Sequence, residues 1–147
     1  MLNSMQNGMA LKTADCLFSP LQFLYWYDKP SPSMEEPELE FFDNVPTVWD
    51  VTKVLHSKIG EYGVIARKKG NEWFIGGING EEARTLEIRF SFLSPGVRYS
   101  AKIYSDDPSV NTRTHVRIET IAVESKDTYT AKMNVNNGFA MHLKPIF

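Results

Sequence analysis

The side chains that most often bind metals or act as nucleophiles are few and scattered in this sequence. The three histidines, His56, His115 and His142, form neither an H-x-H nor an H-E-x-x-H spacing, and we interpret them as surface residues. Cys16 is the single cysteine, which excludes an intramolecular disulfide bond and a cysteine-rich zinc site and favours a buried, inert thiol. The segment Ser105–Pro108 is too short for a calcium-binding loop and predicts a turn.

Phosphate-binding, hydrolase and nucleic-acid-binding motifs are also missing their usual parts. Gly76–Gly80 is rich in glycine, but no Lys-Ser or Lys-Thr pair and no predicted helix follows it, so we interpret it as a tightly packed hairpin. The basic run Arg67–Lys69 flanks a Gly-Asn turn and is interpreted as a solvated hairpin tip. The G-x-S-x-G motif of serine hydrolases does not occur in the sequence.

Adjacent carboxylates occur at three places, Glu35–Glu36, Glu81–Glu82 and Asp106–Asp107. Hydrolysis of a glycosidic bond needs two carboxyl groups roughly 5–9.5 Å apart across a sugar-binding cleft. Neighbours on a strand point to opposite faces of the sheet, so these pairs do not have that arrangement. The sequence therefore nominates no catalytic residue and no metal ligand.

Aromatic side chains are the most informative group for function. Tyr25, Trp26 and Tyr27 follow one another after a predicted helix, while Trp49 and Trp73 lie at the predicted sheet. Exposed aromatic rings stack on sugars, so these five residues could form carbohydrate contacts. They could equally pack in the core or against a protein surface that is absent from this chain. Solvent exposure separates the two interpretations, because a sugar platform needs open ring faces.

Composition places the chain among globular proteins of one domain. Its 147 residues suffice for a core, and 42% of them are hydrophobic and 23% charged. The 16 basic and 18 acidic residues give a net charge of −2, which argues against a nucleic-acid-binding domain and an electrostatic membrane binder. No apolar run approaches the roughly 20 residues of a membrane helix. Met1–Leu24 also lacks the basic and apolar regions of a signal peptide.

Two hydrophobic periods divide the chain. Leu11–Leu24 carries apolar residues at steps of three and four, which predicts an amphipathic helix. A loop rich in proline and serine follows at 29–33, and then a short helix that ends before Pro46. From Thr47 onward apolar and polar residues alternate, which is typical of strands with one dry and one wet face.

We therefore predict a mainly β protein, an antiparallel β-sandwich of about seven or eight strands preceded by an N-terminal α-helical segment. The expected boundary separates residues 1–44, the helical segment, from residues 45–147, the sandwich. Val116–Val123 departs from even alternation, and we predict a β-bulge there.

A series of short motifs runs in order along nearly the whole chain. The motifs are Ser19–Gln22, Val45–Asp50, Thr52–Leu55, Lys58–Tyr62, Ala66–Gly70, Trp73–Gly76, Arg84–Ile88, Ser91–Leu93, Ala101–Tyr104 and Asn137–Ala140. The ordered set closely resembles the C-terminal end of glycoside hydrolase family 97, which contains α-glucosidases and α-galactosidases. The resemblance implies that residues 1–44 correspond to the last helix of a (β/α)8 barrel with its exit loop, and residues 45–147 to a C-terminal β-sandwich.

The resemblance also implies that this chain carries no catalytic machinery of its own. The family's acid, its base or nucleophile and its calcium-holding carboxylates lie upstream in the barrel, and no position here matches them. Calcium is therefore implied for the barrel alone, and the chain would be a fragment or truncated reading frame of a parent exported to the periplasm. Its partner would be the missing barrel, with self-association through the N-terminal helix and carbohydrate as further candidates. The expected function is to scaffold the barrel, and the alternative is a carbohydrate-binding module for α-glucan or other α-linked sugars.

Overall fold

The structure, a computed structural model, describes residues 37–111 and 114–146. Within these ranges a 3-10 helix η1 (Pro37–Leu39) and a helix α2 (Glu40–Asn44) precede eight strands. The strands are β1 (Val51–Lys58), β2 (Tyr62–Lys69), β3 (Glu72–Asn79), β4 (Arg84–Arg89), β5 (Arg98–Asp106), β6 (Val116–Val123), β7 (Thr128–Met133) and β8 (Gly138–Ile146). The predicted short helix before Pro46 is therefore confirmed as η1 and α2. The predicted helix at Leu11–Leu24 lies outside the described residues, and no described helix has the length and hydropathy needed to cross a membrane.

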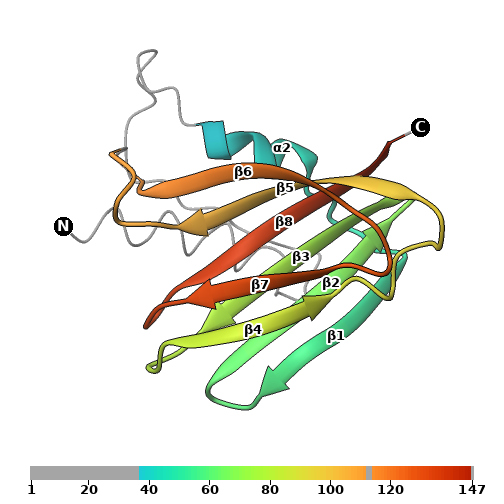
Figure 1. Cartoon of the computed structure of the whole chain (residues 1–147). Coiled ribbons are helices and arrows are strands. Elements are labelled where there is room, and N and C mark those ends of the chain that lie inside the picture. The colour runs from blue at the N-terminus through green and yellow to red at the C-terminus, as the bar shows by residue number, and fades with distance from the viewer. Residues whose placement is uncertain (1–36, 112–113, 147) are drawn as a thin grey trace.

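The strands form two layers, which confirms the mainly β architecture (Figure 1). One layer is a six-stranded antiparallel sheet in the order β1-β2-β3-β8-β5-β6, and the other contains β4 and β7. The main core lies between them, where Ile75, Ile103 and Met141 of the large sheet meet Ile88 of the small sheet with no exposed area. Burial of the apolar set on one face of each strand is what the alternating sequence predicts.

Helix α2 covers part of the opposite face of the large sheet, here called the outer face (Figure 1). Phe41 of α2 is fully buried there, with its ring centroid 6.3 Å from that of Phe74 and 5.2 Å from that of Tyr104. A polar contact also joins this helix to the sheet: Lys102 Nζ donates a hydrogen bond to Glu40 Oε2 at 2.5 Å. The large sheet thus carries a buried apolar cluster on each face.

The predicted β-bulge in β6 is wrong. β6 pairs with β5 without a break from Val116 to Val123, and the structure places a bulge in β1 instead, between Val54 and His56. The uneven pattern in β6 has another cause. Val116 packs in the cluster under α2 on the outer face, whereas Val123 packs in the main core, so opposite faces of one regular strand are buried at its two ends.

The glycine-rich segment Gly76–Gly80 is packed tightly, as predicted, but the predicted hairpin is wrong, because β3 and the following strand β4 lie in different sheets. Gly76 and Gly77 lie within β3, paired with β2 on one side and β8 on the other. A Cβ atom on Gly77 would overlap the ring of Phe139, the residue opposite it on β8. Only glycine at this position lets the Phe139 ring lie flat over the sheet.

Candidate functional site

The aromatic residues that the sequence singled out occupy different environments. Trp73 lies in the main core, where it is 4% exposed and its ring centroid is 4.7 Å from that of Phe92. Trp49 is half-buried at the margin of the outer-face cluster, 5.3 Å from the ring of Phe74. The two tryptophans therefore do not share a surface. Residues 25–27 (Tyr25, Trp26 and Tyr27) lie outside the described residues, and the proposed sugar or barrel contacts of all five remain predictions.

Arg67 is buried beneath Trp49, so its interpretation as part of a solvated hairpin tip is wrong. The residue is 1% exposed, and its guanidinium carbon lies 5.5 Å from the centroid of the Trp49 ring. A cation over an indole face is stabilised electrostatically, the more so when water is excluded. Lys69, by contrast, is exposed as predicted and pairs with Asp50 at 3.2 Å.

His142 is also buried, which corrects its interpretation as a surface residue. It is 5% exposed on the outer face, stacked on Phe74 with centroids 4.2 Å apart, and its Nε2 donates to Glu72 Oε2 at 2.6 Å. Burial lowers the pKa of His142, and the hydrogen bond to Glu72 acts in the opposite direction. The ring therefore favours its neutral form and serves as a packing element beneath the outer face.

An apolar row crosses the outer face, with one residue from each strand of the large sheet. Successive cross-strand partners define it as Val54, Ile65, Gly76, Ala140, Tyr104 and Ile118. The cluster under α2 includes the row from Ala140 to Ile118. At the other end Val54 is 62% exposed, and Ile78, on the same face, is 40% exposed. The outer face thus offers an apolar surface over β1–β3 that α2 does not cover.

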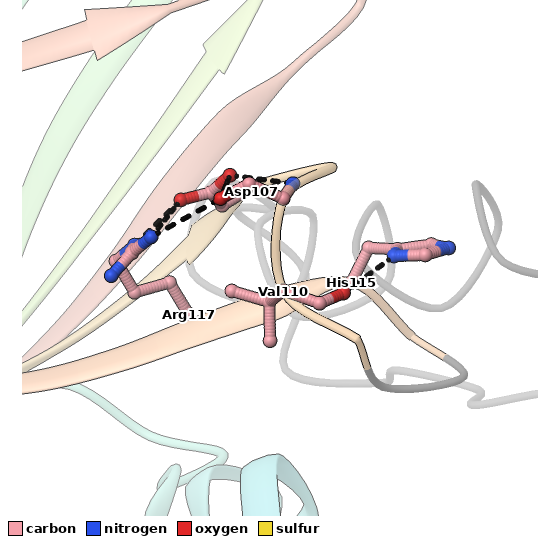
Figure 2. A network of polar contacts seen from close by, with 5 residues as sticks. Asp107, Val110, His115 and Arg117 are labelled. Atoms are coloured by element: carbon pink, nitrogen blue, oxygen red, sulfur yellow. Dashed lines mark hydrogen bonds and ion pairs between the residues drawn. The ribbon is translucent and has the colours of Figure 1, made fainter.

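A polar groove of about 400 Å³ opens between β6, at one edge of the large sheet, and β7 of the small sheet. Asp107, at the start of the β5–β6 loop, organises one wall (Figure 2). Its Oδ1 accepts hydrogen bonds from the backbone nitrogen and the hydroxyl of Ser109, at 2.9 and 2.7 Å, and its Oδ2 accepts one from Arg117 Nε at 2.6 Å. Tyr129 Oη donates to Glu119 Oε1 at 3.2 Å and so joins the two layers.

Those contacts set the protonation states of Asp107 and Tyr129. Hydrogen bonds from the Ser109 side chain and backbone, followed by that from Arg117, lower the pKa of Asp107 to about 2. A glycosidase acid needs a raised pKa in order to hold its proton, so Asp107 is unsuited to that role. Burial, with the nearby Glu119 carboxylate, raises the pKa of Tyr129 to about 12, which keeps its hydroxyl a hydrogen-bond donor.

Within residues 37–111 and 114–146, no group of three or more His, Cys, Asp or Glu side chains is placed to hold a metal ion. Ser105–Pro108 instead ends β5 and begins the turn held by Asp107, as the sequence predicted. The calcium implied by the resemblance concerns the barrel and stays a proposal for that part.

Comparison with known proteins identifies the domain. The family model described as "Glycosyl-hydrolase 97 C-terminal, oligomerisation" matches residues 48–144, from just before β1 into β8. The chain belongs to this family. The predicted resemblance is therefore confirmed, and the match corresponds to the two-layered sandwich described above.

Two curated relatives place the glycoside hydrolase 97 domain within larger proteins. One, a retaining α-galactosidase of Bacteroides thetaiotaomicron, is 35% identical over 119 residues, which cover 80% of this chain and 18% of the relative. The other, a probable retaining α-galactosidase of Streptomyces bingchenggensis, is 32% identical over 100 residues, covering 68% and 15%. The chain therefore corresponds to a small part of each relative's length.

Solved structures agree with the family assignment. A glycoside hydrolase family 97 enzyme from Pseudoalteromonas sp. strain K8, in complex with acarbose, is 31% identical with a TM-score of 0.70. The match covers 76% of this chain and 18% of that one. A β-arabinopyranosidase, 21% identical with a TM-score of 0.60, shares the fold.

Sequence reasoning missed the polar groove of this glycoside hydrolase 97 domain. Asp107 and Arg117 come together because β5 and β6 form a hairpin in which Asp106 faces Val116. The sequence shows the turn at Asp106–Pro108, but the pairing of Asp107 with Arg117, ten residues later, follows only from the register of that hairpin. No local signal connects Glu119 with Tyr129, which lie on different layers.

Proposed function

We propose that this chain is a non-catalytic association domain of a glycoside hydrolase, which braces the catalytic barrel by covering part of its flank. The observation that carries the proposal is the apolar row on the outer face of the large sheet. An antiparallel sheet in an isolated sandwich needs only one dry face, whereas here an apolar row also crosses the second face from Val54 to Ile118. A further protein layer over β1–β3 would remove this surface from water, at about 25 cal/mol of stabilisation per Å² of apolar area.

Two further observations support this function. The family description names oligomerisation, which fits a domain whose work is contact with another protein surface. Asp107, which Ser109 and Arg117 hold at the groove, has a pKa of about 2, and this suits a structural role better than acid catalysis. The relatives are named α-galactosidases, and we extend that class of substrate to the parent enzyme, together with a calcium ion in its barrel and export to the periplasm.

Replacing Val54 and Ile78 with lysine tests the outer face as a contact surface. Without a barrel, the isolated chain is expected to self-associate through this face, and the double variant Val54→Lys/Ile78→Lys is expected to stay monomeric at concentrations where the wild type associates. Two charges on an apolar contact must be desolvated for association to occur, which opposes it. Sedimentation velocity over a range of concentrations measures the effect.

Val135→Lys is the matched control, because Val135 is 51% exposed but lies in the β7–β8 turn, away from the outer-face row. It is expected to associate as the wild type does. A chain that begins at Asp28 separates this contact from one made by the N-terminal segment. Association that survives the double lysine variant but disappears in the shortened chain would contradict the proposed face.

Turnover assays test the non-catalytic part of the proposal. The purified chain is expected to release no nitrophenol from aryl α-galactosides or α-glucosides, with or without calcium, since Asp107, the acid held at the groove, has a pKa of about 2 and does not keep a proton for acid catalysis. Turnover that follows the chain through purification, and that falls in an Asp107→Asn or Glu119→Gln variant, would show that the domain is itself an enzyme.

A further inference from the structure

The polar groove between β6 and β7 has a structural cause in the unequal size of the two layers. The small sheet has two strands and covers the middle of the six-stranded sheet. No third strand of the small sheet lies over β6 among the described residues, which leaves the space between β6 and β7 open. At the opposite edge, a hollow of about 380 Å³ lies between β1 and β4, where His56 Nε2 donates to the Glu87 carbonyl at 2.9 Å. A side-chain hydrogen bond therefore joins the two layers at each edge, but the linings differ.

The β6–β7 groove combines an apolar base with several fixed polar groups. Phe139 and Ala131, both buried, belong to its lining, and the half-buried Tyr129 ring lies 6.4 Å from the Phe139 ring. Asp107 pairs with Arg117 through Oδ2 and so holds its guanidinium in place. The Glu119 carboxylate is positioned in turn by Tyr129.

The charges in this lining indicate the chemistry of a ligand. Three acidic residues, Asp106, Asp107 and Glu119, lie beside two basic ones, Arg117 and Lys132, so the charges nearly cancel and neither a polyanion nor a strong cation is favoured. A sugar hydroxyl both donates and accepts, and can bind a carboxylate and a cationic nitrogen at once. The volume lies within the roughly 300–1,000 Å³ typical of small-ligand sites.

We propose that the β6–β7 groove binds a short neutral oligosaccharide. Hydroxyl groups of the sugar bind Glu119, Arg117 and Lys132, while its C–H face lies against Tyr129. The site is separate from the aromatic residues first considered as sugar contacts, and it lies on the opposite side of the large sheet from the proposed barrel contact. The inference goes beyond the proposed function and does not depend on it.

Titration of the full isotope-labelled chain with melibiose and with maltotriose tests this site by amide NMR. The expected result is a saturable shift of amides in β6 and β7 around Glu119 and Tyr129, with a Kd of about 1 mM or tighter. Lys132→Ala and Tyr129→Phe are each expected to weaken binding about fivefold, since the first removes a hydrogen-bonding group to the sugar and the second removes the hydroxyl that positions Glu119. Lys132 is exposed, so its replacement leaves the core unchanged.

Arg89→Ala is the matched control, because Arg89 is also an exposed cationic strand residue but lines the hollow at the opposite edge. It is expected to bind both sugars as the wild type does. The proposal is overturned if neither sugar shifts any amide at about 10 mM, a concentration that nearly saturates a site with a Kd of about 1 mM. Shifts that map outside the groove, or that are unchanged by both groove variants, overturn it equally.

Discussion

Replacing Gly77 with alanine is expected to lower the free energy of unfolding by about 1–3 kcal/mol, the range typical of overpacked cores. The new Cβ would overlap Cε1 of Phe139 and lie 2.8 Å from Cζ and 2.9 Å from Cδ1. The Phe139 ring cannot move away cheaply, because the residue is 2% exposed and its ring also packs against Tyr129. Urea unfolding followed by circular dichroism measures the change as a lower midpoint at constant slope.

Gly63→Ala is the control for the Gly77 substitution. Gly63 also lies within a strand of the large sheet, β2, but a Cβ there would meet no atom within 4 Å. Its replacement is expected to change stability by no more than about 0.5 kcal/mol, as at ordinary surface positions. Combining Gly77→Ala with Phe139→Leu should cost less than the sum of the two single changes, since the leucine leaves room for the methyl group. Equal losses in the two glycine variants would refute the steric explanation.

The strands were predictable because alternation is a local property of the sequence. Runs such as Tyr99–Ile103 and Tyr129–Met133 bury mainly one face, and their apolar residues identify that face without knowledge of the neighbouring strand. The turn signals are local too: Asn79–Gly80 marks the end of β3, and Pro95–Gly96 lies just before β5. The prediction was weakest where both faces of a strand are buried. In β6 that double burial produced the signal that was read as a bulge.

The environment of individual polar residues was not predictable in this way. Arg67 and His142 have the polarity of surface residues, but the outer face is covered beside them by Trp49 and α2, which are distant in sequence. Likewise, nothing in the sequence separates Trp73, in the main core, from Trp49, at the outer-face margin. Burial of this kind depends on which layer lies over a residue, and that is a property of the tertiary fold.

Phe41→Ala is expected to release α2 from the outer face. Truncating a buried phenylalanine lowers the free energy of unfolding by about 3–5 kcal/mol when the surroundings cannot relax. Helix α2 has only five residues and can undock locally, so the loss cannot exceed the free energy with which α2 docks on the sheet. The remaining contacts, between Lys102 and Glu40 and between Lys144 and Asn44, are exposed and contribute about 0–1 kcal/mol each. They are therefore too weak to hold the helix in place.

Hydrogen exchange measures the docking of α2 directly. The amide of Val45 donates to the Phe41 carbonyl at 3.1 Å, and its protection is expected to fall in Phe41→Ala while amides in β3 and β8 keep theirs. Phe42→Ala is the matched control, because the neighbouring ring is half-buried and its loss should have a smaller effect. Release of α2 would also expose Tyr104 and Ala140, so the variant is expected to self-associate more strongly than the wild type. Wild-type protection of Val45 in Phe41→Ala would show that the outer-face cluster does not depend on this ring, and that another layer holds the helix on the sheet.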